Sequence, residues 1–269
     1  MTFELGPALL FCPADRPERF EKALARADAV ILDLEDAVAP ADKEAARHNL
    51  RSAAVDPQRV IVRVNAPGTS DFASDLAVLA ETGFRTVMVA KAEEPSALDA
   101  FDDRFSLVAL CETARGIAAA DRLAEHPGVV ALMWGAEDLV ASLGGTSSRD
   151  ASGRYRDVAR YARSRVLVEA GARGKTAIDA VHIDIDDAEG LRREAADAVA
   201  SGFGATACIH PGQVQIIRDA YLPDEETASW AHDVLAAAEG ERGVFRFRGQ
   251  MVDEPVLRHA RSVIMRAGR

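Results

Sequence analysis

The sequence SLVALCETARG, residues 106–116, gives the strongest indication of the fold, because an apolar run in it meets a charged residue without a break. A continuous apolar run of this length is expected of a parallel strand that is covered on both faces. Glu112 follows the run directly, and a carboxylate there must find a partner, since an unpaired buried charge is costly. The stretch therefore predicts a buried strand that carries a functional group at its end.

Eight runs of this kind occur along the chain, and longer Ala-rich stretches of helical composition separate them. This alternation favours a closed parallel barrel, the (β/α)₈ or TIM barrel, and 269 residues suit a fold that typically needs about 250. An open doubly wound α/β sheet is the structural alternative. The predicted strands are Ala8–Cys12, Ala29–Leu34, Val60–Val64, Thr86–Ala90, Ser106–Cys111, Val129–Trp134, Ala177–Val181 and Ala205–Ile209. The clearest predicted helices are Pro17–Ala27, Ser74–Thr82, Gly116–Glu125, Tyr155–Ala170 and Ala188–Ser201.

The eight units are complete by residue 222, so we assign residues 1–222 to the barrel and residues 223–269 to a C-terminal extension. The extension is predicted to contain a helix (Asp224–Glu239), the segment Val244–Asp253 and a second helix (Glu254–Arg266). We expect it to serve as a lid or as an oligomer contact.

The composition narrows the class of protein. The formal net charge of −11 argues against a general affinity for nucleic acid or for anionic membranes. The three cysteines, Cys12, Cys111 and Cys208, lie in apolar runs and are odd in number, which indicates reduced core thiols in a cytoplasmic protein. Residues 1–7 lack the pattern of a signal peptide, and no apolar run approaches the ~18 residues of a membrane span.

Polar residues gather at the ends of the predicted strands, where the loops of a barrel converge on one mouth. These residues are Asp33, Glu35, Asp36, Arg63, Asn65, Lys91, Glu112, Glu137, Asp138 and His210. Asp36 or Asp138 could instead cap the following helix by accepting hydrogen bonds from its first amides. Arg63 and Glu112 are harder to explain in that way, because they lie inside or directly after apolar runs. Directed into one mouth, their opposite charges can satisfy each other.

The ligand types at these strand ends favour a hard divalent cation. Carboxylates without accompanying cysteine or histidine suit Mg²⁺, which prefers one or two carboxylates, several waters and oxygen atoms of the substrate. A zinc site is less consistent with the sequence, because His182 and His210 are isolated and the cysteines show no CxxC spacing. We therefore expect Mg²⁺ as the cofactor.

Seven strings in order along nearly the whole chain resemble those of one family. They are LFCPADRPERF (10–20), ILDLEDAV (31–38), VRVN (62–65), ETARG (112–116), WGAEDL (134–139), CIHPGQ (208–213) and GQMVDEPV (249–256). Together they look like the citrate lyase β-subunit-like proteins, within the wider HpcH/HpaI group that includes malyl-CoA and citramalyl-CoA lyases.

This resemblance implies a (β/α)₈ barrel with Mg²⁺ at its mouth, assembled as a homotrimer or as a hexamer. It implies that Glu112 and Asp138 are the metal ligands and that Arg63 binds carbonyl or carboxylate oxygens of the substrate, which Glu112 also borders. Glu35 and Asp36 would lie close to the waters on the metal.

The resemblance further implies a catalytic aspartate, Asp253, on a C-terminal lid that reaches the site of a neighbouring subunit. The expected reaction cleaves a short β-hydroxyacyl-CoA thioester into a keto acid and an acetyl-CoA enolate. Arg63 would stabilise the oxyanion charge and Asp253 would move the proton. The same site could also hydrolyse the thioester. Two alternatives stay open: an aldolase that acts on free 2-keto acids, and an acyl-receiving binding subunit of a citrate lyase complex.

Overall fold

A computed structural model of the chain describes residues 3–241 and 243–268. The chain consists of two compact units, Met1–Ile217 and Arg218–Arg269. The division falls within the helix α9 (Pro211–Tyr221), whereas the boundary predicted from the sequence, after residue 222, lies just beyond the end of this helix.

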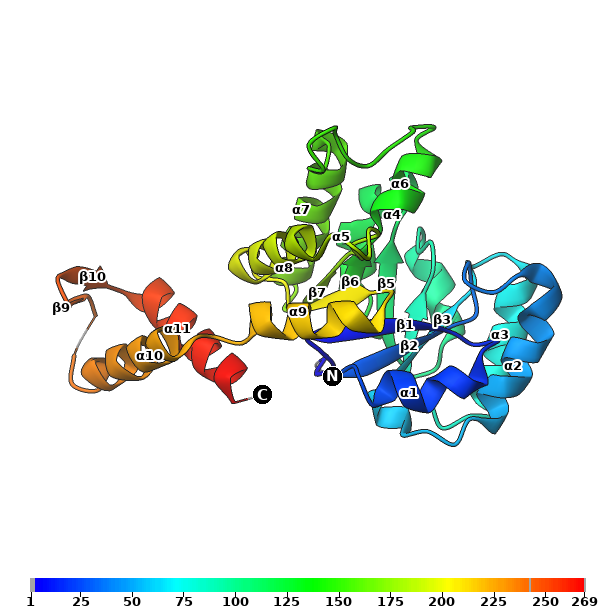
Figure 1. Ribbon diagram of the computed structural model, residues 1–269, viewed down its shortest axis with the longest axis horizontal. Coiled ribbons are helices and arrows are strands. Elements are labelled where there is room, and N and C mark those ends of the chain that lie inside the picture. Colours follow the sequence, from blue (N-terminus) through cyan, green and yellow to red (C-terminus); the bar gives the residue numbers. More distant parts are fainter. Residues whose placement is uncertain (1–2, 242, 269) are drawn as a thin grey trace. The chain divides into compact units, whose positions relative to one another are not determined.

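The first unit is a closed barrel in which all eight strands run parallel and each strand pairs with its neighbours in chain order (Figure 1). This finding confirms the predicted TIM barrel and excludes the open sheet. Each predicted run forms a strand, with ends that differ by at most two residues. The strands are β1 (Ala8–Pro13), β2 (Ala29–Asp33), β3 (Val60–Val64), β4 (Thr86–Val89), β5 (Ser106–Cys111), β6 (Val129–Trp134), β7 (Thr176–Asp179) and β8 (Ala205–Cys208).

Helices cover the strands, and local capping chemistry explains where one of them, α3, starts. α3 begins four residues before the predicted start, because the Thr69 side chain accepts a hydrogen bond from the amide of Phe72. The α-helices of this unit are α1 (Phe20–Leu24), α2 (Lys43–Ser52), α3 (Ser70–Ala80), α4 (Ala114–Ala118), α5 (Ala120–Glu125), α6 (Ala136–Ser142), α7 (Asp157–Ala172), α8 (Ala188–Ser201) and α9. Short 3₁₀ turns cover Pro17–Arg19, Pro40–Asp42, Pro57–Arg59 and Pro95–Ala100.

The predicted helix Pro17–Ala27 is a 3₁₀ turn followed by the short helix α1, and the predicted helix Gly116–Glu125 is two helices that meet at Ala119. A proline is at the first position of every 3₁₀ turn, where its missing N–H costs nothing. Sequence periodicity alone does not distinguish such a turn from the first turn of a helix.

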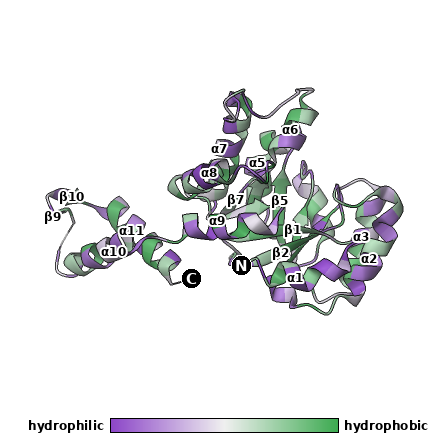
Figure 2. Cartoon of the chain, in the orientation of Figure 1, coloured by the Kyte–Doolittle hydropathy of each residue, from purple (hydrophilic) through white to green (hydrophobic). Residues whose placement is uncertain are grey.

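The strands form the apolar core, and Figure 2 shows them as the most hydrophobic part of the barrel. Every residue of β2, β3 and β6 is buried. Inside the barrel, side chains from successive strands pack on one another, among them Leu9, Ile31, Ile61, Met88 and Val108. Such a packed interior fixes the strand ends, and with them the side chains that the ends carry.

The second unit has its own small core between α10 (Glu225–Ala238), the antiparallel pair β9 (Phe245–Phe247) and β10 (Gln250–Val252), and α11 (Glu254–Ala267). Val234, Val252 and Val263 are buried there. These elements agree with the helices predicted on either side of Val244–Asp253. Nowhere in the described part of the chain does a helix combine the length and the apolar character that crossing a membrane requires.

Candidate active site at the barrel mouth

Glu112 lies directly after β5 and is held in a narrow slot. It is 3% exposed, and its Oε1 accepts a hydrogen bond of 3.0 Å from the backbone amide of Lys91. Gly135 forms one wall of the slot: a Cβ at this position would lie 2.8 Å from the Cβ of Glu112 and 3.0 Å from its Oε2. Burial raises the pKa of Glu112 to about 8. A cation next to this carboxylate would therefore stabilise its ionised form.

Arg63, on β3, is held by an aspartate on the neighbouring strand. Its Nε and Nη2 donate to the two carboxylate oxygens of Asp33, each over 2.6 Å, and the two residues are register partners of β2 and β3. The guanidinium also lies over the ring of Phe11, 4.9 Å from its centre, and its Nη1 is 3.1 Å from Oε2 of Glu35. Such a bidentate pair fixes the plane of the guanidinium as well as its charge.

Lys91, just beyond β4, joins the acids of three different strand ends. Its ammonium donates to Glu35 and, over 2.9 Å, to Asp36, and it lies 3.5 Å from Oδ1 of Asp138. Burial alone lowers the pKa of Lys91, but the hydrogen bonds to Glu35 and Asp36 reverse this effect and raise it. Lys91 is therefore a charged member of the site.

The acids Asp36 and Asp138 do not cap helices. The N-cap of α6 is Gly135, and Asp138 lies inside the first turn of that helix. The N-cap of the 3₁₀ turn after β2 is Ala39, and no side chain caps it. The capping alternative considered for these two acids is therefore wrong, and both side chains point instead to the ammonium of Lys91.

The donors at the mouth fit Mg²⁺. Over residues 3–241 and 243–268, no group of three or more His, Cys, Asp or Glu side chains is arranged to hold a metal ion. Mg²⁺ needs no such group, because it keeps several waters and takes one or two carboxylates. Glu112 and Asp138 offer oxygen only, one from a buried slot and one with 37% of its side chain exposed. His182, the alternative zinc-type ligand, is instead held by Glu194.

A second set of buried polar residues holds the strand ends that form the mouth. Asn65 donates to the carbonyl of Leu34 and to Asp75, and it accepts a bond of 2.7 Å from Lys43. Asp75 is fully buried, and its other oxygen accepts from Nε of Arg47 over 2.8 Å. These bonds tie β3 to α2 and α3 and so fix the ends of β2 and β3.

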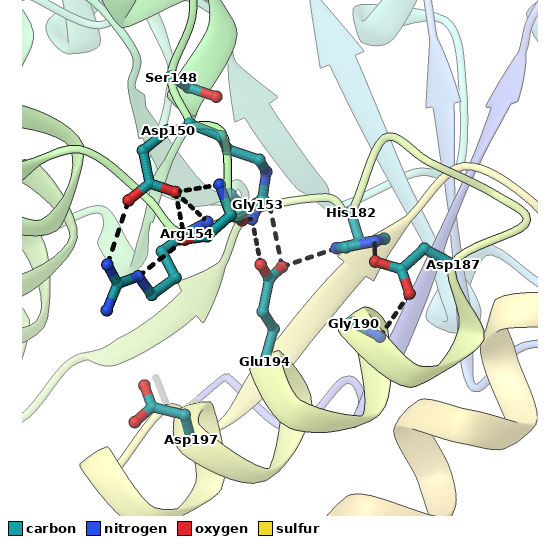
Figure 3. Close-up of polar contacts among 12 residues, drawn as sticks. Ser148, Asp150, Gly153, Arg154, His182, Asp187, Gly190, Glu194 and Asp197 are labelled. Carbon is teal, nitrogen blue, oxygen red and sulfur yellow. Dashed lines mark hydrogen bonds and ion pairs between the residues drawn. The ribbon is translucent and has the colours of Figure 1, made fainter.

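A polar cluster between α7 and α8 lines a cavity of about 370 Å³. Figure 3 shows Glu194 reaching His182, and Asp187 turned toward both His182 and Gly190. Each arginine that lines the cavity is paired with a carboxylate, in the pairs Arg154–Asp150, Arg160–Asp157, Arg163–Asp179 and Arg193–Glu189. Glu194, which also lines it, is paired with Arg149. Because these charges cancel, we assign the cluster to holding the loop between α6 and α7.

Asp253 belongs to the second unit, where it is the N-cap of α11 and accepts a bond of 3.4 Å from the amide of Val256. The five other predicted site residues come together at the mouth. Lys91 contacts Glu35, Asp36 and Asp138, and Arg63 lies close to Glu35 and Glu112. Sequence reasoning gave no role to Asp33, Lys91 or Gly135. The register of β2 and β3 could have identified Asp33, since it pairs opposite Arg63.

Comparisons with known proteins show which family the chain is similar to. The HpcH/HpaI aldolase/citrate lyase family matches residues 8–211. A citrate lyase subunit beta-like protein of Mycobacterium tuberculosis is 56% identical over 263 residues, which cover 98% of this chain and 96% of that protein. The mitochondrial citramalyl-CoA lyase of Mus musculus is 31% identical over 96% of this chain and 84% of its own length. The crystal structure of protein CitE from M. tuberculosis with magnesium, acetoacetate and coenzyme A has a TM-score of 0.92 and 55% identity, over 99% of both chains.

Proposed function

Because the chain belongs to the HpcH/HpaI aldolase/citrate lyase family, we propose that it is a Mg²⁺-dependent carbon–carbon lyase of short β-hydroxyacyl-CoA thioesters. Substrates of the malyl-, citramalyl- or hydroxymethylglutaryl-CoA type would give a keto acid and acetyl-CoA. One observation carries the proposal: the buried Arg63 lies at one barrel mouth with Glu112 and Asp138, two carboxylates that could hold a metal ion. The citramalyl-CoA lyase relative, and the CitE structure with magnesium, acetoacetate and coenzyme A, support it.

Glu112 and Asp138 would hold the metal ion. When bound, Mg²⁺ supplies a Lewis acid for the carboxylate and carbonyl oxygens of the keto-acid half. Arg63 would act on the acetyl half: Asp33 fixes the plane of its guanidinium, and its charge would stabilise the thioester oxygen, which becomes negative in the enolate as the C–C bond breaks. Removing one such donor typically costs about 3–4 kcal/mol of transition-state stabilisation.

The reaction also needs a proton carrier, because the hydroxyl loses a proton as the C–C bond breaks and the acetyl carbon gains one. We assign this role to Asp253. Asp253→Asn tests it selectively, since asparagine keeps the N-cap of α11 while losing the ability to take a proton. We expect slower turnover with unchanged Mg²⁺ affinity and melting temperature. Asp224→Asn, at the equivalent cap of α10, is the control, and equal turnover in the two variants would remove Asp253 from the mechanism.

An activity screen tests the whole proposal. Mg²⁺-loaded protein is assayed against the three types of CoA ester, with keto acid, acetyl-CoA and free acid measured separately. We expect cleavage that stops with chelator and in Glu112→Ala and Asp138→Ala, whose melting curves stay cooperative. Full activity with chelator would refute the metal assignment. Free acid as the product would indicate a thioesterase, and turnover of free 2-keto acids without protection by acetyl-CoA would indicate an aldolase.

Assembly and location are further parts of the proposal. We expect a homo-oligomer, a trimer or a hexamer, in the cytoplasm, and molar-mass measurement in solution tests the assembly. Transfer of an acyl group from a carrier protein, in the absence of any CoA-ester cleavage, would favour the alternative of a citrate lyase subunit.

A further inference from the structure

Lys91 adopts a backbone conformation that residues with a side chain rarely accept. Its φ is +48°, in the left-handed region, although it is not a glycine. Conformations of this kind persist only where surrounding interactions hold them, and they concentrate at functional sites. Lys91 lies two residues beyond β4, at the mouth of the barrel.

This conformation lets one residue contact two groups of acids. The backbone amide of Lys91 donates to Glu112, while its ammonium contacts Glu35, Asp36 and Asp138. These carboxylates follow β2, β5 and β6, so a single residue connects three separate strand ends, β5 through its backbone amide and the other two through its side chain. Lys91 has 28% of its side chain exposed, so its ammonium is accessible from solvent.

Two other cations near the mouth, Arg63 and Lys43, bind mainly to other groups. Arg63 gives two nitrogens to Asp33, and its third is 3.1 Å from Glu35. Lys43 donates to the carbonyls of Leu34 and Glu35 and to Asn65, below the mouth. Lys91 is therefore the cation that offsets the more exposed acids, of which Asp36 has 61% and Asp138 37% of its side chain exposed.

We propose that Lys91 is a positioning residue that sets the charge of the mouth: by holding Glu35, Asp36 and Asp138, it weakens the binding of the divalent cation and admits an anionic substrate. The inference rests on the proposed function for the nature of these two ligands. It has a distinctive consequence, because removing one positive charge strengthens the attraction of a cation and weakens that of an anion. A loss of packing or order would not change the two affinities in opposite directions.

Lys91→Met tests the proposal, because methionine keeps much of the stem and removes the ammonium. We expect the Kd for Mg²⁺, measured by calorimetric titration, to fall about tenfold, which is about 1.4 kcal/mol. We expect the KM for the CoA ester to rise by about the same factor, with kcat within about threefold of wild type. Lys91→Arg keeps the charge and should restore both constants. Lys175→Met, which removes a lysine before β7, at the opposite end of the strands, should change neither.

Lys91→Gly separates this role from a structural one. Glycine adopts a φ of +48° without strain, so the melting temperature should not fall although the ammonium is lost. Unchanged Mg²⁺ affinity in Lys91→Met, or weaker binding of both ligands, would overturn the proposal. The Mg²⁺ titration needs no substrate. A wild-type protein that cleaves none of the CoA esters would therefore count against the proposed function alone, and the titration would still decide the role of Lys91.

Discussion

Replacing Gly135 by alanine should disable the site while the barrel stays folded. The new Cβ would lie 2.8 Å from the Cβ of Glu112 and 3.0 Å from its Oε2. Carbon atoms in favourable contact are about 3.5–4.0 Å apart, so the Glu112 side chain must move by roughly 1 Å. A misplacement of this size can lower turnover by about a hundredfold. Overpacking of this kind typically costs about 1–3 kcal/mol of stability, which a folded domain of this size usually survives.

The assay combines a Mg²⁺ titration, steady-state kinetics and thermal melting of the Gly135→Ala protein. Gly171→Ala is the matched control, because a Cβ at that position in α7 meets nothing within 4 Å and alanine is the better helix former. The control should keep wild-type Mg²⁺ affinity and turnover. If Gly135→Ala also keeps both, Glu112 does not need its slot and the reasoning fails.

Three further predictions concern the residues that support the mouth and the core. Asp33→Ala leaves the buried Arg63 without its bidentate partner, so kcat/KM should fall at least about a hundredfold; near-normal kinetics would contradict the positioning role of Asp33. Asp75→Ala leaves the buried Asn65 amides without their acceptor, whereas Arg47 keeps Glu44 and Asp71 as partners. The free energy of unfolding in urea should therefore fall by about 1–3 kcal/mol, and an unchanged value would show that Asp75 is dispensable. Burial raises the pKa of the Cys12 thiol to about 11, so little thiolate forms below pH 9. Labelling of Cys12 with iodoacetamide at pH 8, followed by mass spectrometry, should therefore be slow in the folded protein and fast in urea. Fast labelling of the folded protein would refute this reasoning.

The strands were predictable because their sequence signal is local. A parallel strand that is covered on both faces must be apolar at nearly every position, and this requirement marks all eight strands to within two residues. The segment between β4 and β5 shows the limit. It contains a 3₁₀ turn, Pro95–Ala100, in place of a full helix, and its length and composition do not exclude a short helix.

The site residues that could be predicted from the sequence are charged residues that lie inside or directly after an apolar run. Arg63 and Glu112 stand out in this way, and the structure confirms that both are buried. Lys91 also follows an apolar run directly, but the run does not reveal which acids it contacts, and Gly135 has no such signal. The role of Lys91 depends on a left-handed φ, and that of Gly135 on the approach of Glu112 from the neighbouring strand, so both emerge only once the barrel has closed.

A net charge of −11 is compatible with an anionic substrate because what the substrate meets is the local arrangement of charge. Asp33 neutralises Arg63 in part but also fixes it, and a neutral residue in place of Asp33 would leave a free but misdirected cation. Glu112 and Asp138 are acids that a divalent cation can offset, and Lys91 balances the acids that remain. Each cation of the mouth is therefore positioned by a carboxylate whose negative charge also partly offsets its positive charge. The substitutions of Asp33 and Lys91 change the net charge of the mouth in opposite directions, and only that of Asp33 also releases the guanidinium of Arg63 from its bidentate partner.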